Sequence, residues 1–449
     1  MSTLAAAMPY SVGRAGQMTR AGYGFIAVFL LVVLEGAVRK WLITGASVTL
    51  LLILLRDLIA IYVIAHAIAN GSLRRLKGVT PLMLGWSCVV FAWGLLQVIG
   101  GESTPTILMI GLRFWLLYTW FGVAAAAAMS EADYRAAMRL AVWTLILMAP
   151  LVVLQYLSPP GARINSQVDG DEEGVFLAIA GVVRTTGTFS FTLGYASYLA
   201  LVSPLVFAVF SARKRGRKQW IYALLALAAF VIGAVVSGSR AAIVYSGIML
   251  ATFFLGRVWL ARGRARRNAI FAVFLAAGLV AILLFIFSGA IDAANQRFEQ
   301  AAEAENPWGR IITIFAGEPF VYDRVSWLGL GLGAGSNLAA YVRTGDPSFT
   351  IAEVEAGRIL LEGGLLGVAY TLLKVIVLAV GLWKSLRLSS RIHSIYPLMI
   401  WMTLALALLT WPAIGQLSAH GLLGVVMTFA LLVFRYPTME FFPARGAST

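Results

Sequence analysis

One short polar segment places an arginine between glutamates. It reads Glu353-Val-Glu-Ala-Gly-Arg-Ile-Leu-Leu-Glu-Gly-Gly-Leu-Leu-Gly367. If this segment is helical, Glu355, Arg358 and Glu362 lie at i, i+3 and i+7 on one helix face. An apolar run follows Glu362, so this carboxylate begins a membrane span or is buried in it. Carboxylates buried this close to an arginine form a structural ion pair or transfer protons, and the spacing leaves both open.

Two further arginines stand beside glycine and hydroxyl side chains at the ends of apolar runs. Arg240 lies in Val-Ser-Gly-Ser-Arg-Ala-Ala, where Gly238 allows a tight turn between two runs. Arg184 precedes Thr-Thr-Gly-Thr-Phe-Ser-Phe. A guanidinium is suited to bidentate contacts with phosphate. The alternatives are that Arg240 reaches lipid phosphates or pairs with a loop carboxylate, and that the segment after Arg184 is an ordinary helix cap with interfacial aromatic residues.

Other residue types that carry chemistry are sparse. A Gly-Leu-Gly-Leu-Gly-Ala-Gly run over 329–335 is a weak signal for nucleotide binding, because no Rossmann-like strand precedes it, and a flexible loop or close helix packing is favoured. Cys88 is the only cysteine, so no disulfide, thiolate metal site or redox pair is available. No Asp or His set has the spacing of a metal site. We therefore expect neither a metal nor a cofactor.

The elements that must position these residues are membrane spans. Hydrophobic residues make up 60% of the 449 residues and charged residues 12%, whereas a soluble chain has roughly 25% charged residues. This composition predicts an all-α polytopic membrane protein, a single domain over residues 1–449. Apolar stretches long enough to cross a hydrocarbon core of ~30 Å number about twelve. They lie near 21–38, 48–69, 79–99, 106–128, 136–157, 189–211, 219–237, 240–260, 268–288, 359–382, 394–412 and 421–436.

The charge pattern predicts how the spans are oriented. Lys and Arg number 35 against 20 Asp and Glu, a net charge of +15. In a soluble protein this excess would indicate nucleic acid as the partner, but here many basic residues cluster between spans, at 74–77, 213–218, 262–267 and 384–391. The positive-inside rule places these loops and both termini in the cytoplasm. Arg39 and Lys40 are an exception on the outer side, and the first apolar run lacks a cleavage site, so we interpret it as a retained span.

Two outer segments are too long to be turns. The first spans 158–188 and contains an acidic run, and the second spans 289–358, with short helices expected over 308–316 and from Ala340 onward. Long loops on a rigid helical frame are frequent sites of function. The positive-inside rule makes arginines unusual on the outer side, so each one there needs a structural or functional explanation. They are Arg163, Arg184, Arg240, Arg297, Arg310, Arg324, Arg343 and Arg358.

The order of these motifs resembles the O-antigen ligase and O-antigen polymerase superfamily. Ser-Gly-Ser-Arg at a span boundary, a large outer loop with Trp-Leu-Gly-Leu-Gly-Leu-Gly, and a polar helix closing with Leu-Leu-Glu-Gly-Gly-Leu-Leu-Gly carry the resemblance, over residues 180–380. It implies a glycosyltransferase that acts on a polyprenyl-diphosphate-linked glycan at the periplasmic face of a bacterial inner membrane. Further implied partners are the lipid bilayer and a chain-length regulator or flippase, and nucleic acid is not expected.

The resemblance also implies roles for individual residues. Arg240 would be the arginine that binds the diphosphate, and Arg310 a second loop arginine, with Arg324 competing for that role. Ligases of the family usually have a His where this chain has Glu353, and no His occurs in the loop. The departure favours a polysaccharide polymerase over a lipid A ligase, with Glu353 or Glu355 as catalytic base. The expected diphosphate- and glycan-binding residues are Arg184, Arg240, Arg310, Arg324 and Arg358.

Physical requirements then suggest a mechanism that needs no metal. Preorganised arginines would stabilise the charge that develops on the diphosphate leaving group, and a carboxylate would deprotonate the acceptor sugar hydroxyl. The competing hypothesis is a polysaccharide-related transporter or flippase, whose path would be lined by charges within the spans. Such charges exist, namely Glu35, Arg56, Asp57, Arg113 and Lys374. We expect them to pair between helices, although a pathway lining remains an alternative.

Overall fold

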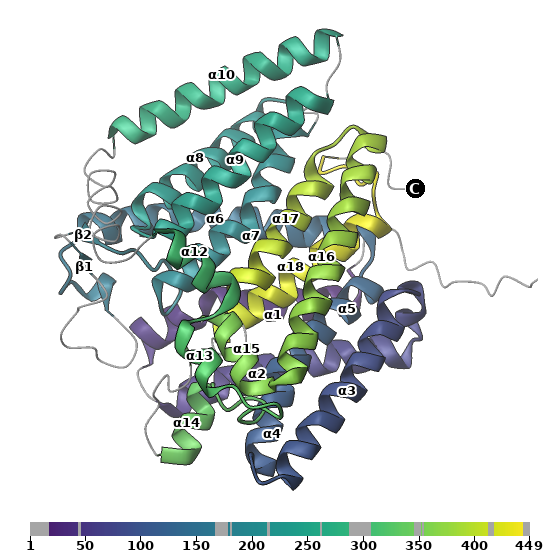
Figure 1. Cartoon of the computed structure of the whole chain (residues 1–449). Coiled ribbons are helices and arrows are strands. Elements are labelled where there is room, and N and C mark those ends of the chain that lie inside the picture. Colours follow the sequence, from purple (N-terminus) through teal and green to yellow (C-terminus); the bar gives the residue numbers. More distant parts are fainter. Residues whose placement is uncertain are drawn as a thin grey trace, which may run out of the picture.

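The structure is a computed structural model of the whole chain. It describes residues 18–43, 46–166, 178–179, 182–212, 216–260, 263–286, 307–344, 352, 354–411 and 417–442, to which all structural statements refer. Helices dominate this part of the chain (Figure 1). Its strands are β1 (Ala178–Ile179) and β2 (Val182–Val183), an antiparallel pair of two residues each. The predicted all-α polytopic class is therefore confirmed.

Ten helical segments in the described part of the chain are long and apolar enough to cross a membrane. They comprise α1 with a π-helical end (Arg20–Ala37 and Val38–Leu42), α2 (Ala46–Ala69), α3 (Val79–Ile99), α4 and α5 joined by a π-helical turn (Pro105–Leu112, Arg113–Leu117 and Tyr118–Ala128), α6 (Glu131–Leu157), α7 (Thr192–Ser211), α8 (Arg217–Val236), α9 (Arg240–Leu260), α16 (Leu365–Ile392) and α18 (Leu417–Arg435). Most coincide with predicted spans to within a few residues.

The remaining helices are shorter or more polar. α10 (Gly263–Ile286) and α17 (Tyr396–Thr410) coincide with the predicted spans at 268–288 and 394–412 but are not among the ten, so the count of twelve stays a prediction. The second long loop contains α12 (Pro307–Ala316), α13 (Pro319–Arg324), α14 (Asn337–Thr344) and α15 (Glu355–Gly363). α12 confirms the short helix expected there, whereas α13 is an element that the sequence did not reveal. Single 3-10 turns lie at Ser72–Arg75 and Arg163–Asn165.

The predicted span at 359–382 is wrong at its start. Gly364 has a φ of 54° and separates α15 from α16, which begins at Leu365. A β-carbon at Gly364 would lie 2.4 Å from the Trp327 carbonyl oxygen, so only glycine fits this turn. The apolar run continues through the break, which is why hydropathy did not reveal it. Glu362 consequently lies in a short separate helix and not in a membrane span.

Capping interactions lock two distant helix starts together. Ser130 caps α6, and its hydroxyl accepts from the Asp133 N–H in a reciprocal capping box. The Asp133 carboxylate also accepts from the Thr19 N–H at 2.9 Å and the Thr19 hydroxyl at 2.6 Å, while Thr19 caps α1. A β-carbon at Gly22 would meet Asp133 at 2.4 Å. The polar ends of α1 and α6 therefore satisfy each other's backbone groups.

The helix ends gather at two opposite faces of the bundle (Figure 1). The basic face is formed by residues 18–19, 70–78, 128–131 and 392–396 together with the C-terminal segment 436–442. Arg75 donates to the Ala127 carbonyl at 3.2 Å and Arg435 to the Met129 carbonyl at 3.1 Å, which ties parts of this face together. The opposite face carries residues 99–105, 157–166, 182–191, 236–240 and the helices α12 to α15. Arg74 and Arg75, in the first predicted basic loop, lie on the first face, as the alternation of spans requires.

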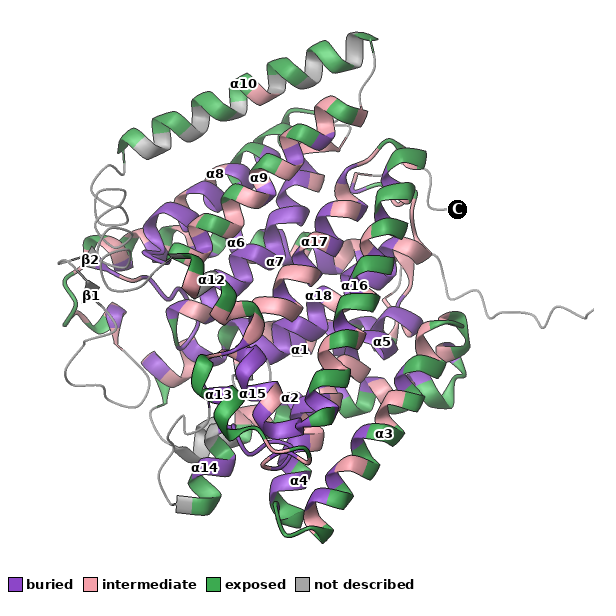
Figure 2. Ribbon diagram, in the orientation of Figure 1, coloured by how far each residue is buried: buried purple, intermediate pink, exposed green. Residues whose placement is uncertain are grey.

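Burial follows the pattern expected in lipid. α7 and α18 form much of the buried core, whereas large apolar side chains on α2, α3, α10 and α16 point outward (Figure 2). Examples are Ile99, which is 75% exposed, and Phe285, which is 84% exposed. A water-soluble protein rarely exposes contiguous apolar surface of this extent. We conclude that the chain is a multi-pass membrane protein.

Charged residues within the spans pair between helices. Arg56 on α2 donates to Glu35 on α1 at 3.1 Å, and its side chain is fully buried. Asp57 on α2 pairs with Arg113 in the π-helical turn and accepts from the Tyr118 hydroxyl at 2.8 Å. Arg56 and Asp57, which are adjacent on α2, thus bind two different neighbouring segments, α1 and the π-helical turn. This arrangement confirms the expectation of interhelical pairing.

These pairs lead to a stability prediction. Arg56→Met leaves the buried Glu35 carboxylate without its α2 partner, and we expect a destabilisation of about 3–5 kcal/mol. Glu131→Gln, the control, removes an exposed ion pair with Arg135 and should cost about 1 kcal/mol or less. Thermal melting of the purified protein in detergent compares the two. Equal melting temperatures for the two variants would contradict a stabilising role for the buried pair.

Candidate functional site

The segment around Arg184 is held by polar side chains from two spans. Lys40, which is 5% exposed, donates to the Thr186 hydroxyl at 2.8 Å and to the Gly187 carbonyl at 2.9 Å. The Gln155 carboxamide oxygen accepts from the N–H groups of Thr186 and Gly187 at 3.2 and 2.8 Å. Gly187 has a φ of 55°, and a β-carbon there would lie 2.7 Å from the Met148 sulfur. The loop is therefore preorganised by groups that the bundle buries.

This loop brings Arg184 beside Arg240. The Thr185 hydroxyl donates to the Val236 carbonyl at 3.1 Å, so the loop lies against the end of α8. Gly238 has a φ of 60° and forms the predicted tight turn into α9, which begins at Arg240. The Ser237 and Ser239 hydroxyls accept from backbone N–H groups of this turn, at 3.2 and 3.4 Å. These contacts help to build the turn.

The two arginines form a concentration of positive charge. Burial lowers the pKa of the Arg184 guanidinium, and the neighbouring charge of Arg240 lowers it further. The Arg184 Nε is buried without a hydrogen-bond partner among the described residues, while the Arg240 side chain is exposed. No salt bridge in the described part of the chain neutralises either one. Like charges held this close favour an anionic ligand such as phosphate.

Glu362 organises the glycine-rich loop. Its carboxylate accepts from the N–H groups of Gly333 and Gly335 at 3.0 and 2.8 Å and from the Trp115 indole at 2.9 Å. Burial raises the pKa of this carboxyl, while the three donors and the charge of Arg358 oppose that rise. Three N–H donors suit an ionised, acceptor-only group. Glu362 therefore anchors the glycine-rich loop. The sequence had suggested an ion pair or a proton-transfer group, and it did not predict this role.

Gln97 on α3 holds the same loop from the other side. Its carboxamide accepts from the Leu332 N–H at 2.9 Å and donates to the carbonyls of Leu328 and Glu362 at 2.7 and 2.8 Å. Gly329, Gly331 and Gly333 have φ values of 85°, 110° and 83°. A β-carbon at Gly333 would lie 2.5 Å from the Gly111 nitrogen. Close packing therefore explains the glycines over 329–335. It was one of the two interpretations that the sequence favoured over nucleotide binding.

Glu355 and Arg358 are both buried on α15, as their predicted helical spacing required. Arg358 is 1% exposed and donates to the Ala352 carbonyl at 3.3 Å, but its Nε and Nη1 have no partner among the described residues. Glu355 is 4% exposed and lies within electrostatic range of Tyr370 and Lys374 on α16. Lys374 donates to the Leu408 carbonyl at 3.2 Å. The start of α15 is thus a buried polar region with unused guanidinium donors.

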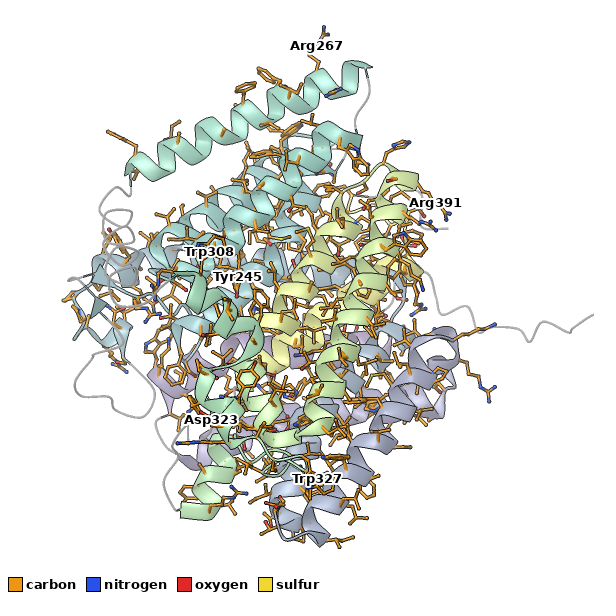
Figure 3. The ribbon with its side chains drawn as sticks, in the orientation of Figure 1. Tyr245, Arg267, Trp308, Asp323, Trp327 and Arg391 are labelled. Carbon is orange, nitrogen blue, oxygen red and sulfur yellow. The ribbon has the colours of Figure 1, made fainter. Side chains whose placement is uncertain are left out.

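α12 and α13 cover this region. α12 packs against α15 and α17, and α17 in turn packs against α9, which begins at Arg240. Glu318, between α12 and α13, accepts from the Val354 N–H at 2.9 Å and so fixes the start of α15. Trp308, Asp323 and Trp327 mark this part of the molecule in Figure 3, whereas Arg267 and Arg391 mark the basic face. The cover therefore contacts α15 directly and reaches α9 only through α17.

The structure separates the predicted site residues into groups. Arg184 and Arg240 form one cluster, and Glu355 and Arg358 lie together in another. Arg310 belongs to α12, but its side chain lies outside the described residues, as does Glu353 entirely. Arg324 is exposed at the end of α13, with its guanidinium 5.4 Å from the Phe320 ring centre, and the choice between Arg310 and Arg324 stays a prediction.

Several residues that shape the site were missed. Lys40, Gln97, Gln155 and Glu318 hold its loops, and the first three are polar residues within or next to apolar runs. That placement was a usable signal, because a polar group at membrane depth needs a partner. Within the described residues, no group of three or more His, Cys, Asp or Glu is arranged to hold a metal ion.

The Glu362 contacts generate a prediction about loop order. In Glu362→Gln the side-chain NH₂ faces an N–H donor, and hydrogen bonds to a charged acceptor are worth about 1.5–3 kcal/mol. We expect amide exchange at Gly333 and Gly335 to accelerate about 10- to 100-fold. Glu102→Gln, at an exposed glutamate nearby, is the control. Unchanged exchange in Glu362→Gln, measured by hydrogen–deuterium exchange mass spectrometry, would show that the carboxylate does not hold the loop.

The sequence was compared with protein-family models and with curated proteins. No family model matches the sequence, and no curated protein matches it either. The function must therefore be argued from the chemistry of the chain's own residues, with the two adjacent arginines and the buried start of α15 as its main elements.

Proposed function

We propose that the chain is a glycosyltransferase that polymerises, or transfers, polyprenyl-diphosphate-linked oligosaccharide units at the face opposite the basic one. The observation that carries the proposal is that Arg184, on a preorganised loop, lies near Arg240 at the start of α9, and that no described carboxylate neutralises either one. A diphosphate is the anion expected at a membrane surface that would satisfy two guanidinium groups. The resemblance to O-antigen ligases and polymerases supports the same substrate class.

The proposed reaction uses the two clusters for different tasks. The acceptor hydroxyl oxygen attacks the anomeric carbon of the donor while a carboxylate takes its proton, and the bond from that carbon to the diphosphate oxygen breaks. The departing lipid diphosphate gains negative charge, which Arg184 and Arg240 stabilise. Arg358, buried with free Nε and Nη1 donors, contributes further positive charge from α15. Arg310 on α12 is the fourth arginine in this scheme.

A carboxylate at the start of α15 serves as the proposed base. Glu355 is buried beside Arg358 and near Lys374, and Glu353 precedes it by two residues in the chain. Placing the base under α12 and α13 would exclude water from the reacting sugars and limit hydrolysis of the donor. Movement of this cover would be needed for the acceptor to enter.

The positive-inside rule supports the proposed location. The basic face would be cytoplasmic, which places both termini in the cytoplasm and the two arginine clusters in the periplasm of a bacterium. Polymerisation there needs a substrate that has already crossed the inner membrane. The proposed place of the protein is thus after a flippase in surface or exopolysaccharide synthesis.

Removal of Arg240 tests the diphosphate site. Arg240→Ala should lower polymer formation about 10²- to 10³-fold, because a preorganised donor to the leaving group is lost. Arg343→Ala, at an exposed arginine of α14, should leave polymer length unchanged, and both variants must insert at normal levels. Electrophoresis of the extracted polysaccharide gives the result. Normal polymer in Arg240→Ala would refute the proposal.

Substitution of the carboxylates tests the base. Glu355→Gln and Glu353→Gln are each isosteric, and loss of the true base should slow extension about 10²- to 10⁴-fold. Cells should then accumulate a single lipid-linked repeat unit on the periplasmic leaflet. Normal polymer extension in both variants would exclude Glu353 and Glu355 as the catalytic base. Accumulation of the lipid-linked repeat unit on the cytoplasmic leaflet would favour the flippase alternative.

A further inference from the structure

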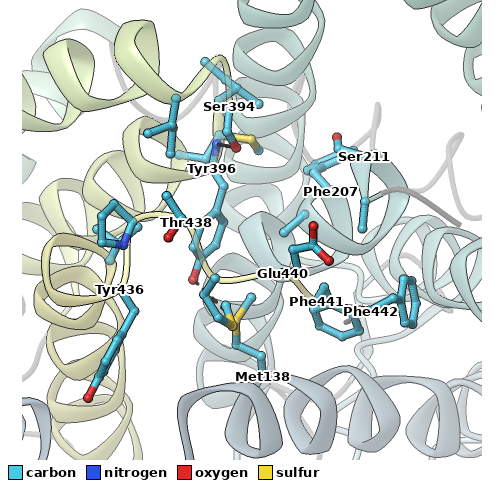
Figure 4. Close-up of a pocket in the computed structure, with 18 residues that line it drawn as sticks. Met138, Phe207, Ser211, Ser394, Tyr396, Tyr436, Thr438, Glu440, Phe441 and Phe442 are labelled. Atoms are coloured by element: carbon cyan, nitrogen blue, oxygen red, sulfur yellow. Dashed lines mark hydrogen bonds between the residues drawn. The ribbon is translucent and has the colours of Figure 1, made fainter. Parts of the chain in front are cut away.

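The short helix α17 shows how deep the cover formed by α12 and α13 lies. α17 starts at the basic face, because Tyr396 lines a cavity of about 460 Å³ there, together with Ser211 at the end of α7 and Tyr436 just after α18 (Figure 4). The 15 residues of α17 extend over about 22 Å, whereas the hydrocarbon core is ~30 Å thick. The other end of α17, at Thr410, therefore lies about 8 Å short of the opposite membrane boundary.

A contact between α17 and α9 agrees with this depth. The Thr410 hydroxyl lies 2.5 Å from the Tyr245 hydroxyl. Tyr245 follows Arg240, the first residue of α9, by five residues, so it lies about 7.5 Å inside the bundle from that end. Counts along two different helices thus place the end of α17 below the membrane boundary.

α12 packs against α17 and therefore lies at this boundary, not above it. Packed helices approach to about 8–10 Å between their axes, which is close to the depth of Thr410. Three large apolar side chains of α12 are exposed, namely Trp308 at 74%, Ile312 at 63% and Phe315 at 49%. They lie at i, i+4 and i+7 and so form an apolar stripe on one face of the helix. This stripe faces away from the bundle at a height where lipid is present.

The other groups of α12 suit contact with lipid. The Thr313 hydroxyl donates to the Gly309 carbonyl at 2.9 Å, so its hydrogen bond is made within the helix. The one charged residue of α12, Arg310, occupies a helix position almost opposite the apolar stripe. A helix with a tryptophan and aliphatic residues on one face and a basic residue on the other is typical of helices that lie in the membrane interface.

The segment that follows α13 also reaches below the end of a span. The Trp327 side chain is 74% exposed, and its ring lies edge-on to the Trp93 ring with 6.3 Å between the ring centres. The Trp93 indole N–H donates to the Leu328 carbonyl at 3.0 Å. Trp93 precedes Ile99, the last residue of α3, by six residues, or about 9 Å. Because Phe91 on the same helix is 54% exposed, Trp327 adjoins the lipid-facing surface of α3.

We propose that the cover is seated in the membrane leaflet opposite the basic face, with Trp308, Ile312 and Phe315 in contact with lipid. The bilayer is the partner because the stripe is apolar, lies at the membrane boundary and belongs to a segment that adjoins a lipid-facing span. This position does not depend on the glycan chemistry. One consequence rests on the proposed function: a lipid-linked donor would reach the buried start of α15 from the leaflet, beneath the cover.

Spin labelling of the full chain in liposomes tests the position of α12. Cys88 is the only cysteine, so in a Cys88→Ala background Ile312→Cys carries a single nitroxide on the apolar stripe. Asp323→Cys, at an exposed acid of α13 (Figure 3), is the aqueous control, and Phe91→Cys on α3 is the lipid reference. We expect a nickel chelate to collide with the label about tenfold less often at Ile312 than at Asp323, because hydrocarbon excludes a hydrated metal complex. Oxygen should collide with the label equally often at Ile312 and Phe91.

Two results would overturn the proposal. Equal nickel access at Ile312 and Asp323 would place the stripe in water, and shielding of Ile312 from both nickel and oxygen would show that protein, such as a second copy of the chain, covers it. Photo-crosslinking replaces spin labelling if Ile312→Cys does not fold. A phospholipid with a diazirine on its acyl chain should label the peptide from Trp308 to Phe315 in the unaltered protein, and absence of this label would refute lipid contact. Neither readout needs a substrate, so each is independent of the Arg240→Ala test.

Discussion

A polar group buried in an apolar bundle has no water to bind, so each one must find a partner within the protein. In this chain, four of these groups bind distant loops. Lys40 and Gln155 bind the segment that carries Arg184, and Gln97 and Glu362 bind the glycine-rich loop. The same interactions satisfy buried side chains and give irregular loops a defined shape. Loop geometry on the face opposite the basic one therefore depends on a few polar residues that the protein buries.

This constraint also distinguishes structural charges from those available for chemistry. Glu35, Arg56, Asp57 and Arg113 form interhelical pairs. Arg184 and Arg358 form no salt bridge with a described carboxylate, although, like Arg56 and Arg113, they keep guanidinium nitrogens without partners among the described residues. Burial of unsatisfied donors is costly unless something compensates for it, and an anionic substrate would do so. The contrast between paired and unpaired arginines is the physical basis of the proposed diphosphate site.

The spans were predictable because length and apolarity alone define them, and α3 and α9 match their predicted bounds residue for residue. The helical spacing of Glu355, Arg358 and Glu362 was predictable because periodicity is local. The break at Gly364 was not, since its cause is the close approach of Trp327, more than thirty residues earlier. The role of Glu362 was hidden for a similar reason, because its partners Trp115, Gly333 and Gly335 come together only in the fold. Sequence reasoning thus identified candidate residues for chemistry and missed those that hold the loops around them.

The bond from Gln97 to the Glu362 carbonyl joins residues 265 positions apart. Contacts of such sequence separation form late, because much of the chain must be made and inserted before the partner exists. During synthesis, α3 would be inserted in the membrane before the Gln97 carboxamide has its final hydrogen-bond partner. The glycine-rich loop takes its final shape only after α15 has docked. A chain interrupted before α15 would have the same hydropathy in its spans as the complete protein but no assembled site. Quality control that detects unpaired polar groups in the membrane would distinguish the two.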